Sequence, residues 1–131
     1  MLVEKRAPDL IARTKAFSLA AIRFYSRMPR ETVAQILGRQ LLRSATSVGA
    51  QYREARRAKS TADFISKTEG ALQEVDEAGY WLELIQESGI ETDGSINALR
   101  AEAKELLAIF VAITRTAKQN RLRSQIGRAH V

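Results

Sequence analysis

Apolar residues recur every three or four positions through most of this chain, which is the spacing of one face of an α-helix. Pro29, Ser60 and the loop Gly89–Gly94 interrupt the pattern and divide it into four segments. The segments predict helices over residues 9–28, 31–58, 61–88 and 95–122. Because each helix carries one apolar stripe and the connections are short, the pattern predicts an antiparallel up-down-up-down four-helix bundle.

The same pattern predicts which residues form the core and where the bundle ends. On the second helix, the residues that step by three or four and should face inward are Val33, Leu37, Leu41, Ser44, Val48, Tyr52 and Ala55. After Leu122 the apolar spacing is lost, so we expect residues 1–122 to form the bundle and residues 123–131 a flexible tail. At 131 residues, the chain is one domain.

Composition agrees with an all-α fold and removes most enzyme chemistry. The chain has 2 prolines, 7 glycines and no cysteine, and its one histidine, His130, lies in the expected tail. Thiolate sites, histidine bases and the usual glutamate–histidine metal sites of bundles are therefore absent. No uncharged apolar run is long enough to span a membrane. We expect a cytoplasmic protein that is not an enzyme, with no cofactor, no metal and no catalytic residues.

The net charge is +6, and the charged residues are unevenly distributed along the sequence. Residues 60–93 carry nine acidic groups against one lysine, whereas residues 30–59 and 94–131 each carry seven basic groups against two acidic ones. One explanation is internal, because an acidic helix packs favourably beside basic neighbours. The other is an acidic partner, with nucleic acid the first candidate.

Small residues fill the middle of the second helix, from Ser44 to Ala50. Gly49 costs about 1 kcal/mol relative to alanine in a helix interior, so a close packing contact should offset it. We therefore expect this segment to lie tightly against another subunit. The predicted interface residues are Thr46, Ser47, Gly49 and Ala50.

Basic residues gather on the outer face of the second helix and at the ends of the second and fourth helices. These helices run parallel in an up-down-up-down bundle, so their cationic ends should form one basic pole. Phosphate groups are the natural ligand of such a surface. The predicted nucleic-acid-binding residues are Arg39, Arg43, Arg53, Arg56, Arg57, Lys59, Arg115, Lys118 and Arg121.

Several spaced residues resemble a known family. The segment RSATSVGAQYREA over residues 43–55 is followed by Asp63-Phe64, Ala71-Leu72, and the helix end Glu87-Ser88-Gly89. This arrangement resembles the bacterial four-helix bundle protein family, which includes proteins encoded by intervening sequences in 23S rRNA genes. Gly49 stands where the family commonly has proline. More distantly, the chain resembles accessory proteins of diversity-generating retroelements.

The resemblance implies a homo-oligomer, with a pentameric ring as the expected form, and no biochemical activity. It also makes nucleic acid a possible partner, and a reverse transcriptase one only if the chain serves a retroelement. Two functions remain open at this point. The protein is either an accessory or structural factor that binds RNA or DNA, or a protein–protein scaffold without nucleic-acid binding.

Overall fold

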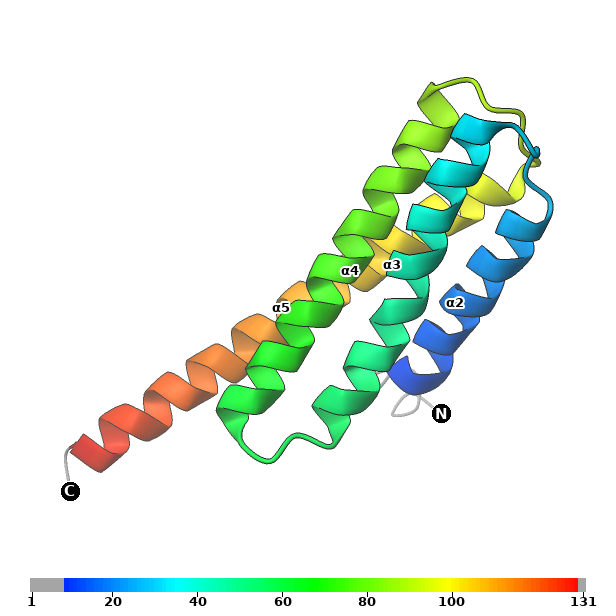
Figure 1. Ribbon diagram of the computed structural model, residues 1–131. Helices are drawn as coiled ribbons and strands as arrows, with labels where there is room; N and C mark the ends of the chain where they lie inside the picture. The colour runs from blue at the N-terminus through cyan, green and yellow to red at the C-terminus, as the bar shows by residue number, and fades with distance from the viewer. Residues whose placement is uncertain (1–8, 130–131) are drawn as a thin grey trace, which may run out of the picture.

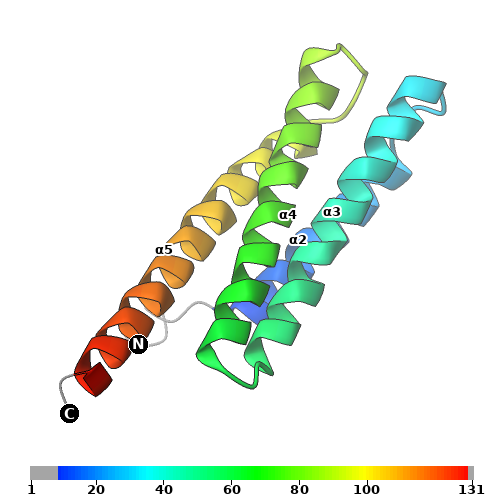
Figure 2. The same cartoon turned by 60° about the vertical axis from the view of Figure 1, so that its left-hand side comes forward.

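The computed structural model describes residues 9–129, and every regular element in that range is a helix. Successive helices run in opposite directions and lie side by side (Figures 1 and 2). The expected all-α four-helix fold is confirmed. The helices are α2 (Leu10–Ser26), α3 (Thr32–Arg56), α4 (Thr61–Glu87) and α5 (Ser95–Ala129).

Local side-chain chemistry explains where the helices begin and end. The Asp9 carboxylate accepts a hydrogen bond from the Ala12 N–H at 3.1 Å, and the Ser60 hydroxyl accepts one from the Asp63 N–H at 3.0 Å. Each satisfies a donor that the first helical turn leaves free. At the other end of α4, Gly89 has φ +78°, a conformation that glycine adopts without steric cost.

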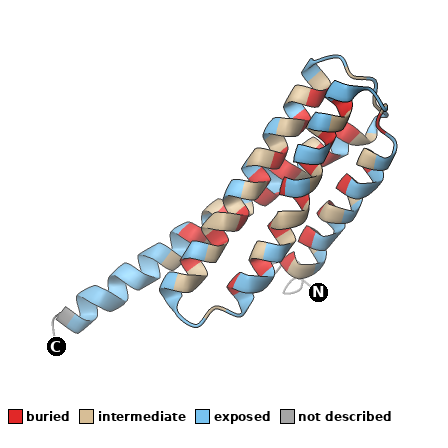
Figure 3. Ribbon diagram, viewed as in Figure 1, coloured by how far each residue is buried: buried red, intermediate tan, exposed pale blue. Residues whose placement is uncertain are grey.

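The core lies between all four helices and contains large aromatic and aliphatic side chains (Figure 3). Phe17, Phe24, Phe110, Leu41 and Leu82 are at most 2% exposed. Burying one such side chain contributes about 1.5–3 kcal/mol. The core therefore supplies the main driving force for the bundle.

In the first turns of α3, the residues that face the core are not the predicted ones. Val33 is 56% exposed and Leu37 is half-buried, whereas Ala34 and Gly38 are buried. A Cβ atom on Gly38 would lie 2.7 Å from Cδ1 of Tyr25, so α2 and α3 approach too closely here for a larger residue. Small residues consequently face inward and Val33 faces outward.

The C-terminal helix is longer than predicted. α5 continues to Ala129, so residues 123–129 are helical rather than a flexible tail, while His130 and Val131 lie outside the described residues. Residues 121–128 are all exposed, and this segment extends beyond the rest of the bundle (Figure 1). Leucine, arginine, glutamine and alanine in this segment favour helix, whereas Ser124 and Gly127 oppose it, so α5 continues without core contacts on weak local propensity alone.

Candidate nucleic-acid interface and subunit surfaces

The C-terminal ends of α3 and α5 point toward the same end of the bundle (Figure 1). Exposed basic residues lie on both helices there and on the loop that follows α3. We call this set the cationic end. It consists of Arg53, Arg56, Arg57, Lys59, Arg115, Arg121, Arg123 and Arg128.

The α5 part of the cationic end contains no acidic residue. After Glu105 the sequence carries five basic residues and no aspartate or glutamate. Arg123 and Arg128 were not among the predicted binding residues, because the helix was expected to end at Leu122. Arg123, Gln125 and Arg128 favour helix, but Ser124 and Gly127 do not, so helix propensity gives only a weak signal for these two arginines.

Two predicted binding residues instead form ion pairs with α4. The Arg43 guanidinium donates to the Glu77 carboxylate and lies 3.6 Å from that of Glu74. The Lys118 ammonium lies 2.6 Å from the Glu69 carboxylate. The acidic helix thus neutralises part of its basic neighbours, as the internal explanation of the charge pattern proposes.

The other seven predicted binding residues form no ion pair within residues 9–129. All seven are exposed. Contact with the Tyr52 hydroxyl group raises the pKa of Arg56 above its ordinary value. The charge of this set is therefore not neutralised by acidic side chains of the described residues. The set consists of Arg39, Arg53, Arg56, Arg57, Lys59, Arg115 and Arg121.

The small residues of α3 do not all have the role expected of them. A Cβ atom on Gly49 would lie 3.3 Å from Oγ1 of Thr14, and the Ser18 hydroxyl donates to the Ala45 carbonyl at 3.0 Å. Gly49 therefore makes room for α2 of its own chain, not for another subunit.

The other three predicted interface residues lie nearer the surface. Thr46 and Ser47 are half-buried, and their hydroxyl groups donate to carbonyls of their own helix at 2.8 and 2.7 Å. Ala50 is exposed. Their place in a subunit contact stays a prediction.

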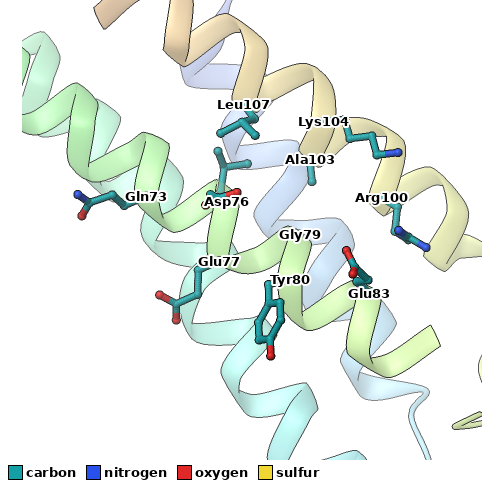
Figure 4. Close-up of a pocket in the computed structure, with 11 residues that line it drawn as sticks. Gln73, Asp76, Glu77, Gly79, Tyr80, Glu83, Arg100, Ala103, Lys104 and Leu107 are labelled. Carbon is teal, nitrogen blue, oxygen red and sulfur yellow. The ribbon is translucent and has the colours of Figure 1, made fainter. Parts of the chain in front are cut away.

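A groove of about 620 Å³ runs between α4 and α5 (Figure 4). Its floor is apolar, with Val75 and Gly79 on α4 and Ala103 and Leu107 on α5. Gly79 has no neighbouring atom within 4 Å of the position that a Cβ would occupy. The groove could not be predicted from the sequence, because a glycine in a helical pattern does not reveal whether its surroundings are filled.

The described residues hold no group of three or more acidic, histidine or cysteine side chains placed to bind a metal ion. Glu54 pairs with Lys67 at 2.7 Å, and Glu77 with Arg43. Oε1 of Glu74 is buried without a hydrogen-bond partner in the described structure. In residues 9–129, no helix has the length and apolar character that crossing a membrane requires.

The family model described as 23S rRNA-intervening sequence protein matches residues 8–112. The chain belongs to this family. One similar solved structure is a Bacteroides thetaiotaomicron protein of unknown function from the S23 ribosomal protein family. It has 31% identity and a TM-score of 0.73, over 80% of this chain and 94% of that one. No curated protein matches significantly. The resemblance inferred from sequence is confirmed, and the basic residues after Ala112 lie beyond the family match.

Proposed function

We propose that this protein is a non-enzymatic, oligomeric four-helix bundle that binds RNA or DNA in the cytoplasm as an accessory or structural factor. The observation that carries the proposal is the acid-free basic segment of α5, which is exposed and lies at the same end as the basic end of α3. The family's association with 23S rRNA intervening sequences supports a nucleic-acid partner.

Phosphate contacts suit this surface better than contacts with bases. Arginine and lysine attract the phosphate backbone without reading sequence, and binding releases counterions. Stacking on bases would require exposed aromatic rings beside the cations. Tyr80 and Trp81 are instead late in α4, where the Trp81 indole N–H donates to Glu77 at 3.3 Å. We therefore expect little sequence preference and strong dependence on salt.

An electrophoretic shift with duplex and single-stranded RNA and DNA tests the proposal. The wild-type protein should bind in 50 mM salt and lose affinity by at least about tenfold at 200 mM, since each neutralised phosphate steepens the salt dependence. Reversing Arg53, Arg56 and Arg57 to glutamate should abolish the shift. Binding that is unchanged by salt or by the reversal would contradict the proposal.

The matched control reverses charge at the opposite end of the bundle. Arg23 is exposed on the last turn of α2, and Arg30 is exposed in the following loop. Reversing both to glutamate changes the net charge by as much as reversing Arg56 and Arg57 alone, so comparing these two double variants tests whether net charge alone explains the loss. This control should retain most of the affinity that the α3 variant loses.

The second candidate function is a protein–protein scaffold that binds no nucleic acid. It is favoured by the pairing of Arg43 and Lys118 with α4 and by the outward-facing Val33 and Ile36. In this case the triple reversal would change the oligomer measured by light scattering, and the wild type would shift no nucleic acid. A particle of five chains would agree with the ring that the family resemblance implies. A reverse transcriptase remains a partner only for a retroelement-linked protein.

A further inference from the structure

Interior glycines of α3 and α4 fall into two classes. Gly38, Gly49 and Gly70 each face a close side chain of another helix in the chain, within 2.7, 3.3 and 2.8 Å of an added Cβ. Gly79 faces nothing within 4 Å, although it lies well inside α4. Glycine is unfavourable relative to alanine in a helix interior. The packing of the single chain explains the first class but not Gly79.

Gly79 forms part of the floor of the α4–α5 groove. Figure 4 places Ala103 and Leu107 of α5 on one side of the groove and Gly79 on the α4 side. The two rims carry opposite charge: Asp76 and Glu83 are exposed on α4, whereas Arg100 and Lys104 line the α5 side. A groove with an apolar floor and one acidic rim suits a helix ridge that carries both apolar and basic residues.

Such a ridge lies on the outer face of α3. Val33 and Ile36 are 56% and 53% exposed, and the exposed Arg39 is one turn further along. Residues spaced by three or four lie on one face of a helix, and this face continues through Arg43, which is paired with Glu77 of its own chain, to Ser47 and Ala50. We call the set Val33, Ile36, Arg39, Ser47 and Ala50 the α3 ridge. Its large apolar residues point outward because Ala34 and Gly38 occupy the inward positions.

We propose that the α3 ridge of one copy packs into the α4–α5 groove of a neighbouring copy. Ile36 lies over Gly79, and Arg39 faces the acidic rim formed by Asp76 and Glu83. This inference rests on the proposed homo-oligomer and names the two surfaces that build it.

A second copy is the occupant because one chain carries both halves of the contact. The ridge is apolar and carries Arg39, while the groove has an apolar floor, an acidic α4 rim and a basic α5 rim. Complementary charge therefore favours the docking in which Arg39 faces α4. The two surfaces lie on different helices, so the contact is heterologous and each copy uses one surface toward each of two neighbours. Repetition of this contact produces a ring if the rotation closes.

Two single substitutions block the two surfaces separately. Gly79→Leu fills the groove without meeting an atom of its own chain near the Cβ position. Ile36→Arg places a charge in the apolar part of the ridge. Each variant should keep the wild-type helical circular dichroism and weaken self-association, measured by light scattering, by at least about tenfold. Leu19→Arg on α2 is the control, because Leu19 is 41% exposed but lies outside the ridge.

Mixing the two variants provides the decisive test. The Ile36→Arg copy has an intact groove and the Gly79→Leu copy an intact ridge, so the mixture should form a complex of two chains, each of 14.6 kDa, and nothing larger. If the two variants assemble like the wild type, the ridge–groove contact is overturned, and the oligomer must form through other surfaces. A mixture that stays monomeric would overturn the heterologous contact.

Self-association and nucleic-acid binding of the wild-type protein, measured side by side, distinguish failure of this inference from failure of the proposed function. A monomeric wild type that still shifts nucleic acid would overturn the contact and the oligomer, but not nucleic-acid binding. A wild type that assembles through ridge and groove without binding nucleic acid would support the contact and favour the scaffold function. A ridge that binds only a different protein would overturn the proposal.

Discussion

Glycine has different roles where α2 packs against α3 and where α4 packs against α5. We call these two contact regions the α2–α3 seam and the α4–α5 seam. At the first, Gly38 lets the two helices approach until a Cβ would meet Tyr25 and the Met28 sulfur at 2.7 and 2.8 Å. At the second, Gly79 faces an open groove. A glycine in a helical pattern therefore marks a close approach in one seam and an unfilled surface in the other.

Hydrogen bonds show the same contrast. In the α2–α3 seam, Ser18 donates to the Ala45 carbonyl near the middle, and Tyr25 donates to Gln35 at 2.6 Å. In the described part of the α4–α5 seam, polar contacts lie toward its ends, where Arg100 donates to Gln86 and Lys118 pairs with Glu69. The α2–α3 seam is therefore filled by side chains of one chain, whereas the α4–α5 seam contains a groove that its own chain leaves unfilled.

Truncating one leucine in each seam should produce the largest difference in unfolding free energy between the two seams. Leu41 is fully buried, so Leu41→Ala removes its contacts and leaves a cavity, at a cost of about 2–5 kcal/mol of unfolding free energy. Leu107 is only half-buried on the groove floor, so Leu107→Ala should cost about 1 kcal/mol in the monomer. Urea denaturation at low protein concentration measures both, and equal losses would show that the groove is as well packed as the core.

The same substitution at the two glycines should have opposite signs. Gly38→Ala forces Tyr25 and Met28 to move, and overpacking of this kind costs about 1–3 kcal/mol, which exceeds the gain in helix propensity and should destabilise the protein. Gly79→Ala meets nothing and should stabilise the monomer by up to about 1 kcal/mol. Thermal unfolding measures the difference, and a loss of stability at Gly79 would mean that the groove is already occupied within the chain.

A weaker effect is expected where the loop before α5 meets the end of α2. Hydrogen bonds from the Ser95 hydroxyl, the Arg27 guanidinium and the Ser95 N–H lower the pKa of Asp93 to about 2. Its unfolded value is about 3.9, so the stabilisation is present above about pH 4 and is lost as the pH falls through 2.

Asp93→Asn should therefore lower the melting temperature slightly at pH 6 and leave it unchanged near pH 2. Melting curves across this range provide the measurement. A variant that differs from the wild type equally at both pH values would show that titration of Asp93 is not the cause.

Much of the fold follows from the sequence, because apolar spacing, Pro29, Ser60 and Gly89 define where helices can begin and end. The inward face of α3 did not follow, since both Val33 and Ala34 are apolar and only the distance to α2 decides which is buried. The end of α5 did not follow either, because the absence of an apolar stripe does not prevent a helix from continuing.

The candidate site was predictable to a similar degree. Helix direction alone places the basic ends of α3 and α5 together. The pairing of Arg43 with Glu77 depends on the register of α3 against α4, which residue spacing does not reveal. The role of Gly49 likewise depends on Thr14, a residue of another helix.

A disulfide cross-link tests directly whether the open groove over Gly79 receives the α3 ridge of a second copy. Because the chain contains no cysteine, Ile36→Cys and Gly79→Cys variants can be mixed and oxidised without background disulfides. If the α3 ridge occupies the groove, a covalent dimer should form in the mixture and should be weak or absent with either variant alone; this is the expected result. Equal cross-linking of each variant with itself, or none in a mixture that light scattering shows to be oligomeric, would contradict it.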